Sequence, residues 1–189
     1  MADGRKIKYF TSREQWRKWL SVNFLKSDEV WLLYPKKPSG KKRILYNDAV
    51  EEALCFGWID SIYQAHDAES TIQRFTPRKP KSSYSQANRE RLKWLFDRDM
   101  IHPKVLQSVE PIIKQSFVLP ADIIKEIQQN PVAWMHFQHF SAPYQRIRIA
   151  YIDSARKRPE EFRKRLTNFI KKTAENKLIR GFGGIDKYY

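Results

Sequence analysis

The chain has 189 residues and a single cysteine, Cys55. One thiol excludes an intramolecular disulfide framework and a metal site built from several thiolates, and it fits a reducing compartment. Because Cys55 stands between Leu54 and Phe56, we expect a small buried apolar side chain rather than a reactive thiol.

Long apolar runs are also missing. No segment approaches the ~20 apolar residues of a membrane-spanning helix, and residues 1–10 are polar and charged rather than typical of a signal peptide. We therefore expect a cytoplasmic protein with no transmembrane segment. The motifs G-x-x-x-x-G-K-[ST], G-x-G-x-x-G and G-x-S-x-G do not occur, which excludes the most common nucleotide-binding and hydrolase signatures. The sequence predicts no cofactor.

Acidic residues are few beside basic ones. The chain has 21 Asp and Glu against 36 Lys and Arg, a formal net charge of +15. Aromatic residues make up 14% of it, which indicates a folded globule with an aromatic core rather than a disordered basic chain. The charge attracts nucleic acid, anionic lipid and acidic small molecules, and it does not distinguish between them.

The first half of the chain alternates helix and strand patterns. Thr11 and Glu14 form a capping box before apolar residues at helical spacing. A short apolar run at 29–35 is typical of a central strand buried on both faces, and Gly57 can end a helix. We expect strands at 29–35, 58–65 and 71–76, and helices from Thr11, over 46–54, and after a cap at Ser83 or Ser85.

The second half is helical, with Pro120, Pro131, Pro143 and Pro159 each at the start of a helix. The predicted fold class is α+β. An N-terminal α/β unit, residues 1–117, has a small sheet flanked by helices, and an all-helical unit follows at 118–180. A tail rich in glycine and aromatic residues, 181–189, ends the chain.

A basic loop is the main candidate site. Between Ser70 and Arg89 there are five cations and no acid, and the loop leads into a predicted helix. Guanidinium and ammonium groups, hydroxyls and exposed backbone N–H groups together favour an anion. A second basic segment, 36–43, is a candidate second wall, and the sequence leaves open whether the two meet. The predicted ligand-binding residues are Arg74, Arg78, Lys79, Lys81, Ser82, Ser83, Ser85, Trp58 and Asp60.

The carboxylates in this half have structural interpretations. Trp58 and Asp60 share one strand face, so we expect Asp60 to be partly buried and paired with Arg74 on the neighbouring strand. The alternative is a base in a cleft, for which no partner residue is identified. Glu51 and Glu52 point about 100° apart on a helix, so we expect solvated carboxylates rather than an acid/base pair.

His136 and His139 lie three residues apart on a predicted helix, a spacing that some metal sites use. No carboxylate ligand lies nearby in the sequence. We therefore expect both rings to serve packing or a polar helix edge, and we predict no metal site.

Four ordered blocks carry a family resemblance. They are Asp28-Glu-Val-Trp-Leu32, Ala53-Leu-Cys-Phe-Gly-Trp-Ile-Asp60, Phe75-Thr-Pro-Arg-Lys-Pro-Lys-Ser82 and Tyr151-Ile-Asp-Ser-Ala-Arg156. The chain resembles the bacterial YdeI/OmpD-associated family, also labelled bacteriocin-protection proteins. This resemblance implies an α/β unit followed by a helical unit and a link to envelope stress or antimicrobial peptides. It implies no catalytic residue.

Three hypotheses of function follow. In the first, a non-enzymatic protein uses the Arg74–Ser85 loop, with 36–43, to hold an anionic small molecule or an acidic protein surface. In the second, basic C-terminal helices bind nucleic acid in a stress protein, because residues 156–180 carry a net charge of +7. In the third, Asp60, Arg74 and Lys79 form the cleft of an enzyme.

Overall fold

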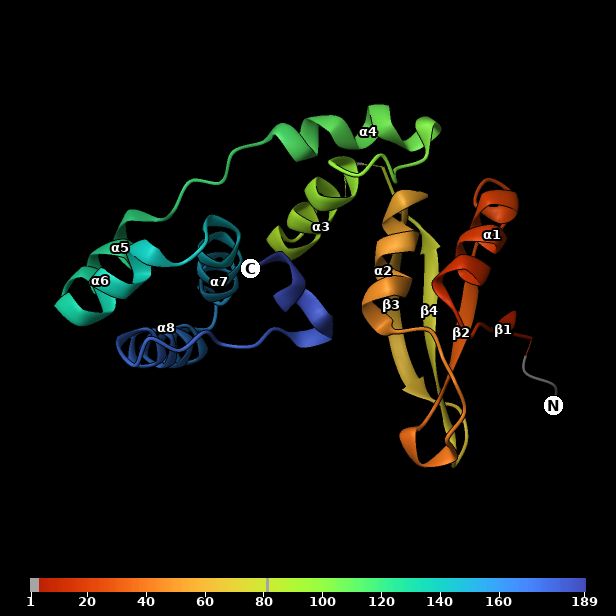
Figure 1. The fold of residues 1–189 in the computed structure, drawn as a ribbon, viewed down its shortest axis with the longest axis horizontal. Helices are drawn as coiled ribbons and strands as arrows, with labels where there is room; N and C mark the ends of the chain where they lie inside the picture. Colours follow the sequence, from red (N-terminus) through yellow and green to blue (C-terminus); the bar gives the residue numbers. More distant parts are fainter. Residues whose placement is uncertain (1–3, 81) are drawn as a thin grey trace. The chain divides into compact units, whose positions relative to one another are not determined.

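A computed structural model describes residues 4–80 and 82–189. The chain forms two compact units. The sheet unit contains the residues up to Ser83 together with Leu95–Glu110, and the helical unit contains Tyr84–Trp94 and Pro111–Tyr189. Figure 1 shows the elements of each.

The sheet unit is built on four strands in the order β1-β2-β4-β3. β1 is parallel to β2, whereas β2 and β3 both pair antiparallel with β4. The predicted central position of the apolar run is confirmed, because β2 pairs on both sides and all of its residues except Leu33 are buried. The bounds are β1 Ile7–Tyr9, β2 Val30–Pro35, β3 Trp58–Ala65 and β4 Ser70–Pro77.

Two helices, α1 (Arg13–Asn23) and α2 (Tyr46–Cys55), pack on one face of this sheet. The Trp16 ring lies 5.5 Å from that of Phe75, and its Nε1 donates to Ala49 O at 3.0 Å. The expected cap of α1 is wrong by one residue. Ser12, not Thr11, accepts from the backbone N–H of Gln15, because Thr11 donates its own N–H and hydroxyl to the Gln15 side chain.

The other elements of the first half are short or shared between the units. A turn of 3-10 helix, η1 (Lys37–Ser39), follows β2. α3 (Gln86–Phe96) and α4 (Pro103–Lys114) each contribute residues to both units. Gly57 ends α2 as predicted, with a φ of +71° that side chains rarely adopt.

The helical unit confirms the proline pattern, since each of the four prolines lies at a helix cap or in a first turn. Its core includes Ile123, Phe137 and Phe169. The aromatic tail docks within the unit, because Tyr189 lies edge-on 4.7 Å from Tyr144. The α+β class is thus confirmed. The bounds are α5 Ala121–Gln128, α6 Pro131–His139, α7 Ala142–Asp153, α8 Pro159–Ala174 and the 3-10 helix η2 Phe182–Tyr188.

Candidate functional site

Several side chains of the predicted basic loop make hydrogen bonds within the loop. Arg78 Nη1 donates to Ser82 Oγ and Ser83 O, both at 3.0 Å, so these three residues come together. Lys79 is exposed. Ser85 belongs to the helical unit, where its hydroxyl accepts from the Asn88 N–H at 3.3 Å and caps α3.

Two further residues of this loop need separate mention. Lys81 lies outside the described residues. Arg74 is engaged with Glu29, whose Oε2 lies 2.7 Å from Nε and 2.5 Å from Nη2. Hydrogen bonds from Arg74 and then Trp31 hold the pKa of the Glu29 carboxyl below its ordinary value. Most of the charge of Arg74 is therefore offset within the sheet unit.

The expected pairing of Asp60 with Arg74 is wrong. Asp60 stands opposite Phe75 in the β3–β4 ladder, so it faces α1 and α2, whereas the adjacent Arg74 faces the other side of the sheet. Asp60 Oδ2 instead accepts from Tyr46 Oη at 2.8 Å and from Gln73 Nε2 at 3.4 Å. Asp60 and Arg74 therefore do not line a common cleft. The enzyme hypothesis depended on that arrangement and is not supported by it.

A buried hydroxyl lies near Asp60. Tyr34 is 5% exposed, and its Oη makes no hydrogen bond within the described part of the chain. Burial is the main cause of its raised pKa, and the charges of Tyr46 and Asp60 act in the same direction. Trp58, the other predicted ligand residue, is buried and donates from Nε1 to Phe24 O at 3.1 Å, so it serves the core.

The two basic segments lie at opposite ends of the sheet. The β2–β4 ladder runs from Val30 opposite Phe75 to Pro35 opposite Ser70. This ladder spans five residue steps, about 17 Å. Lys36 continues from one end of it, and Arg78 lies three residues beyond the other end. Residues 36–43 do not form a second wall for the Arg78 loop.

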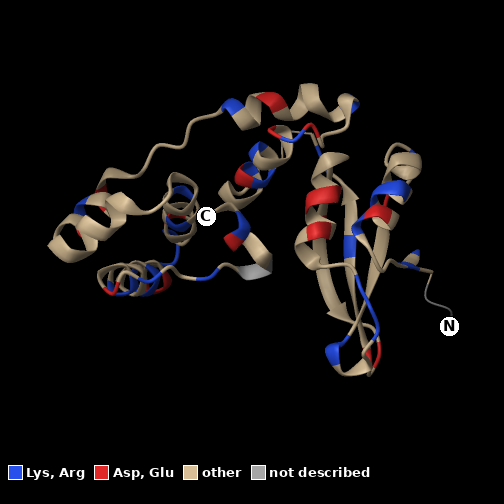
Figure 2. Cartoon of the chain, viewed as in Figure 1, with Lys and Arg blue, Asp and Glu red and all other residues tan. Residues whose placement is uncertain are grey.

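The segment Lys36–Arg43, which we call the lysine segment, is anchored at three points. Lys36 Nζ donates to Ala68 O at 2.8 Å, Arg43 Nη1 donates to Pro35 O at 2.7 Å, and Tyr9 Oη donates to Lys42 O. Its remaining cationic side chains, Lys37, Lys41 and Lys42, are exposed. Figure 2 shows these basic residues between β2 and α2. The anchors hold the backbone while the lysines reach solvent.

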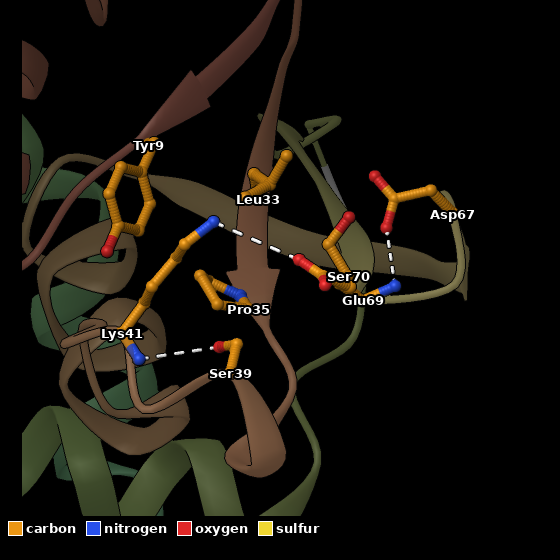
Figure 3. Close-up of a pocket in the computed structure, with 8 residues that line it drawn as sticks. All are labelled: Tyr9, Leu33, Pro35, Ser39, Lys41, Asp67, Glu69 and Ser70. Carbon is orange, nitrogen blue, oxygen red and sulfur yellow. Dashed lines mark hydrogen bonds and ion pairs between the residues drawn. The ribbon is translucent and has the colours of Figure 1, made fainter.

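A pocket of about 240 Å³ opens beside this segment. Figure 3 shows Tyr9, Leu33 and Pro35 forming its apolar part, with the Lys41 side chain extending across them toward Glu69. Lys41 Nζ and Glu69 Oε2 are 4.0 Å apart. Asp67 lies on the same rim, and the nearby Ser70 hydroxyl, followed by the hydrogen bond from the Glu69 N–H, lowers the pKa of its carboxyl. Its residues are Tyr9, Leu33, Pro35, Ser39, Lys41, Asp67, Glu69 and Ser70.

The expectation of solvated carboxylates on α2 is wrong. The side chains of Glu51 and Glu52 are 0% exposed. Arg13 pairs with both, and Arg17 Nη1 lies 2.7 Å from Glu52 Oε2. Burial lowers the pKa of Arg13, but the two carboxylates outweigh it and leave that pKa raised. This cluster fastens α1 to α2, and both of its buried carboxylates are held in ion pairs.

One sequence signal could have revealed this cluster. Apolar residues surround Glu51 and Glu52 at positions 49, 50 and 53–56, on nearly every side of the helix. A helix that is apolar all round is buried, and its charges must then be paired. Arg13 and Arg17, four residues apart on one face of α1, supply the partners.

A similar ion pair holds a buried carboxylate in the helical unit. Glu90, 5% exposed, similarly accepts from Arg146 Nε at 2.6 Å in the helical unit. Each such pair is neutral, so the net charge of +15 resides on the remaining side chains.

The other expected features have simple environments. Cys55 is buried as expected, and burial raises the pKa of its thiol to about 12. His136 Nδ1 lies 2.9 Å from Thr173 O, and His139 Nδ1 lies 2.7 Å from Met135 O. Within 4–80 and 82–189, no group of three or more His, Cys, Asp and Glu side chains could hold a metal. No described helix is long and apolar enough to cross a membrane.

Two family models match the chain. Residues 8–108, more than half of the sequence, match the family described as a domain of unknown function, DUF8412, and the chain belongs to this family. Residues 116–176 match the family described as Bacteriocin-protection, YdeI or OmpD-Associated. The resemblance seen in the sequence is thus confirmed for the C-terminal part, whereas its three N-terminal blocks fall within the first family. No curated protein and no solved structure matches.

Proposed function

We propose that this protein is a non-enzymatic binding protein that holds an anionic ligand or an acidic protein surface through its lysine segment. The observation that carries the proposal is the anchoring of Lys36, Arg43 and the Lys42 carbonyl, which leaves Lys37, Lys41 and Lys42 exposed on a fixed backbone. A binding element that is already ordered loses little entropy when its partner arrives. The cytoplasmic location expected from the sequence is part of the same proposal.

The exposed cations of the Arg78 loop play a smaller part. Arg78 donates to Ser82 and Ser83, and Arg74 is paired with Glu29. Lys79 remains exposed. The link to bacteriocin protection, which the description of the second family suggests, then arises from binding and needs no catalytic step. The link to envelope stress, expected from the resemblance in the sequence, is explained in the same way.

A pair of charge-matched variants tests the proposal. The first replaces Lys37, Lys41 and Lys42 with Ala, and the control replaces three exposed lysines of the helical unit with Ala. The control positions are Lys157, Lys164 and Lys171. Both variants lower the net charge of +15 by three. A glutamate-rich peptide and inorganic phosphate serve as probes, titrated by fluorescence anisotropy and calorimetry respectively.

We expect the first variant to lose about tenfold or more in affinity for at least one probe, since three ion pairs of ~0.5 kcal/mol each add to about 1.5 kcal/mol. The control should change affinity by less than about twofold. Equal losses in both variants would show that only the overall field matters and would refute the site. Tight DNA binding that depends steeply on salt and is weakened mainly in the control would favour the nucleic-acid hypothesis instead.

A further inference from the structure

The pocket beside the lysine segment has apolar walls and charged side chains at its mouth. Tyr9, Leu33 and Pro35 lie on the sheet face away from α1 and α2, because they alternate with the residues that face Phe75 and Gln73. The Tyr9 ring is fixed by its hydroxyl bond to Lys42 O. The pocket has a volume of about 240 Å³.

The charges at its mouth form an open pair. Lys41 Nζ and Glu69 Oε2, 4.0 Å apart, are beyond hydrogen-bonding distance, and their side chains are 64% and 74% exposed. Figure 3 shows this pair spanning the space above Pro35. An exposed pair of this kind contributes little, so a ligand can separate it at small cost.

The combination of one cation and nearby carboxylates selects the ligand charge. Inside the pocket, a simple anion on Lys41 would face Glu69 and Asp67, and a simple cation on Glu69 would face Lys41, whereas an anion on the solvent side of the lysine segment meets neither carboxylate. A molecule with both charges replaces one weak ion pair by two. We propose that the pocket binds a small zwitterion with an apolar side chain, such as a free amino acid, whose carboxylate pairs with Lys41 and whose ammonium pairs with Glu69. The side chain then covers Leu33 and Pro35.

Three matched probes test this inference. L-Leucine carries both charges, 4-methylpentanoate lacks the ammonium, and 3-methylbutylamine lacks the carboxylate. Each is titrated into the ¹⁵N-labelled protein while the amide signals of Ser39, Glu69 and Ser70 are followed by NMR. We expect saturable shifts with leucine and at least about threefold weaker binding of both analogues, as the loss of one ion pair predicts.

Two conservative variants separate the charges. Glu69→Gln should make leucine and 4-methylpentanoate bind equally, and Lys41→Gln should do the same for leucine and 3-methylbutylamine. Lys37→Gln, outside the pocket lining, is the matched control and should preserve leucine binding. The inference is overturned if 4-methylpentanoate binds the unmodified protein as tightly as leucine does, or if leucine gives no saturable shift up to about 50 mM.

The same measurements keep this inference distinct from the proposed function, although both use Lys41. The double variant Lys37→Ala, Lys42→Ala retains Lys41 and should still bind leucine while losing affinity for the acidic peptide. If the double variant loses peptide binding as expected but no leucine binding is detected, the zwitterion site alone is refuted. Leucine binding in a protein that ignores acidic peptide and phosphate would refute the proposed function alone.

Discussion

The buried cluster between α1 and α2 makes the strongest stability prediction. Replacing Glu52 with Gln keeps the size of the side chain, so it creates no cavity, but it removes the charge that Arg13 and Arg17 share. Breaking a fully buried ion pair costs about 3–5 kcal/mol because the remaining charge stays desolvated. Here the guanidinium side chains are 20% and 38% exposed, so water partly compensates, and we expect a loss of about 2–3 kcal/mol.

Urea unfolding at neutral pH measures this loss. Trp16, Trp19 and Trp58 form an aromatic cluster in the same unit, so their fluorescence reports on its unfolding. Glu29→Gln is the matched control, because the Glu29–Arg74 pair belongs to the same unit but is about one-third exposed on both sides. That control should cost less than ~1 kcal/mol.

A second comparison sharpens the reasoning. Glu51 also accepts from Asn47 Nδ2 at 2.8 Å, whereas Glu52 serves two guanidinium groups. Glu52→Gln should therefore destabilise more than Glu51→Gln. If Glu52→Gln costs no more than Glu29→Gln, the cluster is not a major source of stability and our account of the α1–α2 contact is wrong.

Three further changes probe other contacts. Tyr34→Phe removes a buried hydroxyl that has no hydrogen-bond partner in the described residues. Urea unfolding should therefore show an unchanged free energy of unfolding or a gain of up to ~1 kcal/mol. A clear loss of stability would show that the hydroxyl has a partner after all. Hydrogen bonds from Arg156 are the main cause that lowers the pKa of Asp122 to about 2. The ionised carboxylate therefore stabilises the fold at pH values above its unfolded pKa of about 3.9, and this contribution is lost as the pH falls toward 2. Acid unfolding of Asp122→Asn should lack this small component. Tyr189→Phe removes the hydroxyl that accepts from Arg148, which should lower thermal stability by ~1 kcal/mol, and an unchanged melting temperature would contradict the docked tail.

The order of elements could be predicted because its signals are local. Pro131, Pro143 and Pro159 have no N–H to lose in a first helical turn, and the structure has a helix starting at or beside each. The cap of α1 was harder to place, since Thr11 and Ser12 both carry hydroxyls. The backbone geometry at the helix start decides which of the two neighbouring hydroxyls reaches the Gln15 N–H.

Side-chain pairing could not be predicted in the same way. A register shift in β3 between Asp60 and Tyr63 changes which of the later residues share a face of the sheet. The sequence contains no Gly or Pro there that would predict it. Asp60 lies before this shift, opposite Phe75, and meets Tyr46 of α2, a residue 14 positions away, while Arg74 meets Glu29, 45 positions away. Partners at such separations depend on how helices and strands pack, which the local sequence does not specify.

The strand register also limits what the basic segments can bind. They were candidates for one shared recess, but Lys36 and Arg78 lie beyond opposite ends of the antiparallel β2–β4 ladder, which alone is about 17 Å long. A single phosphate or carboxylate contacts cations only within a few ångströms, so it can occupy one segment and not both. A typical protein interface buries about 800 Å² on each partner, which is wide enough to span that distance. The lysine segment therefore acts alone toward a small anion, and any partner that also engages Lys79 must be an extended acidic surface.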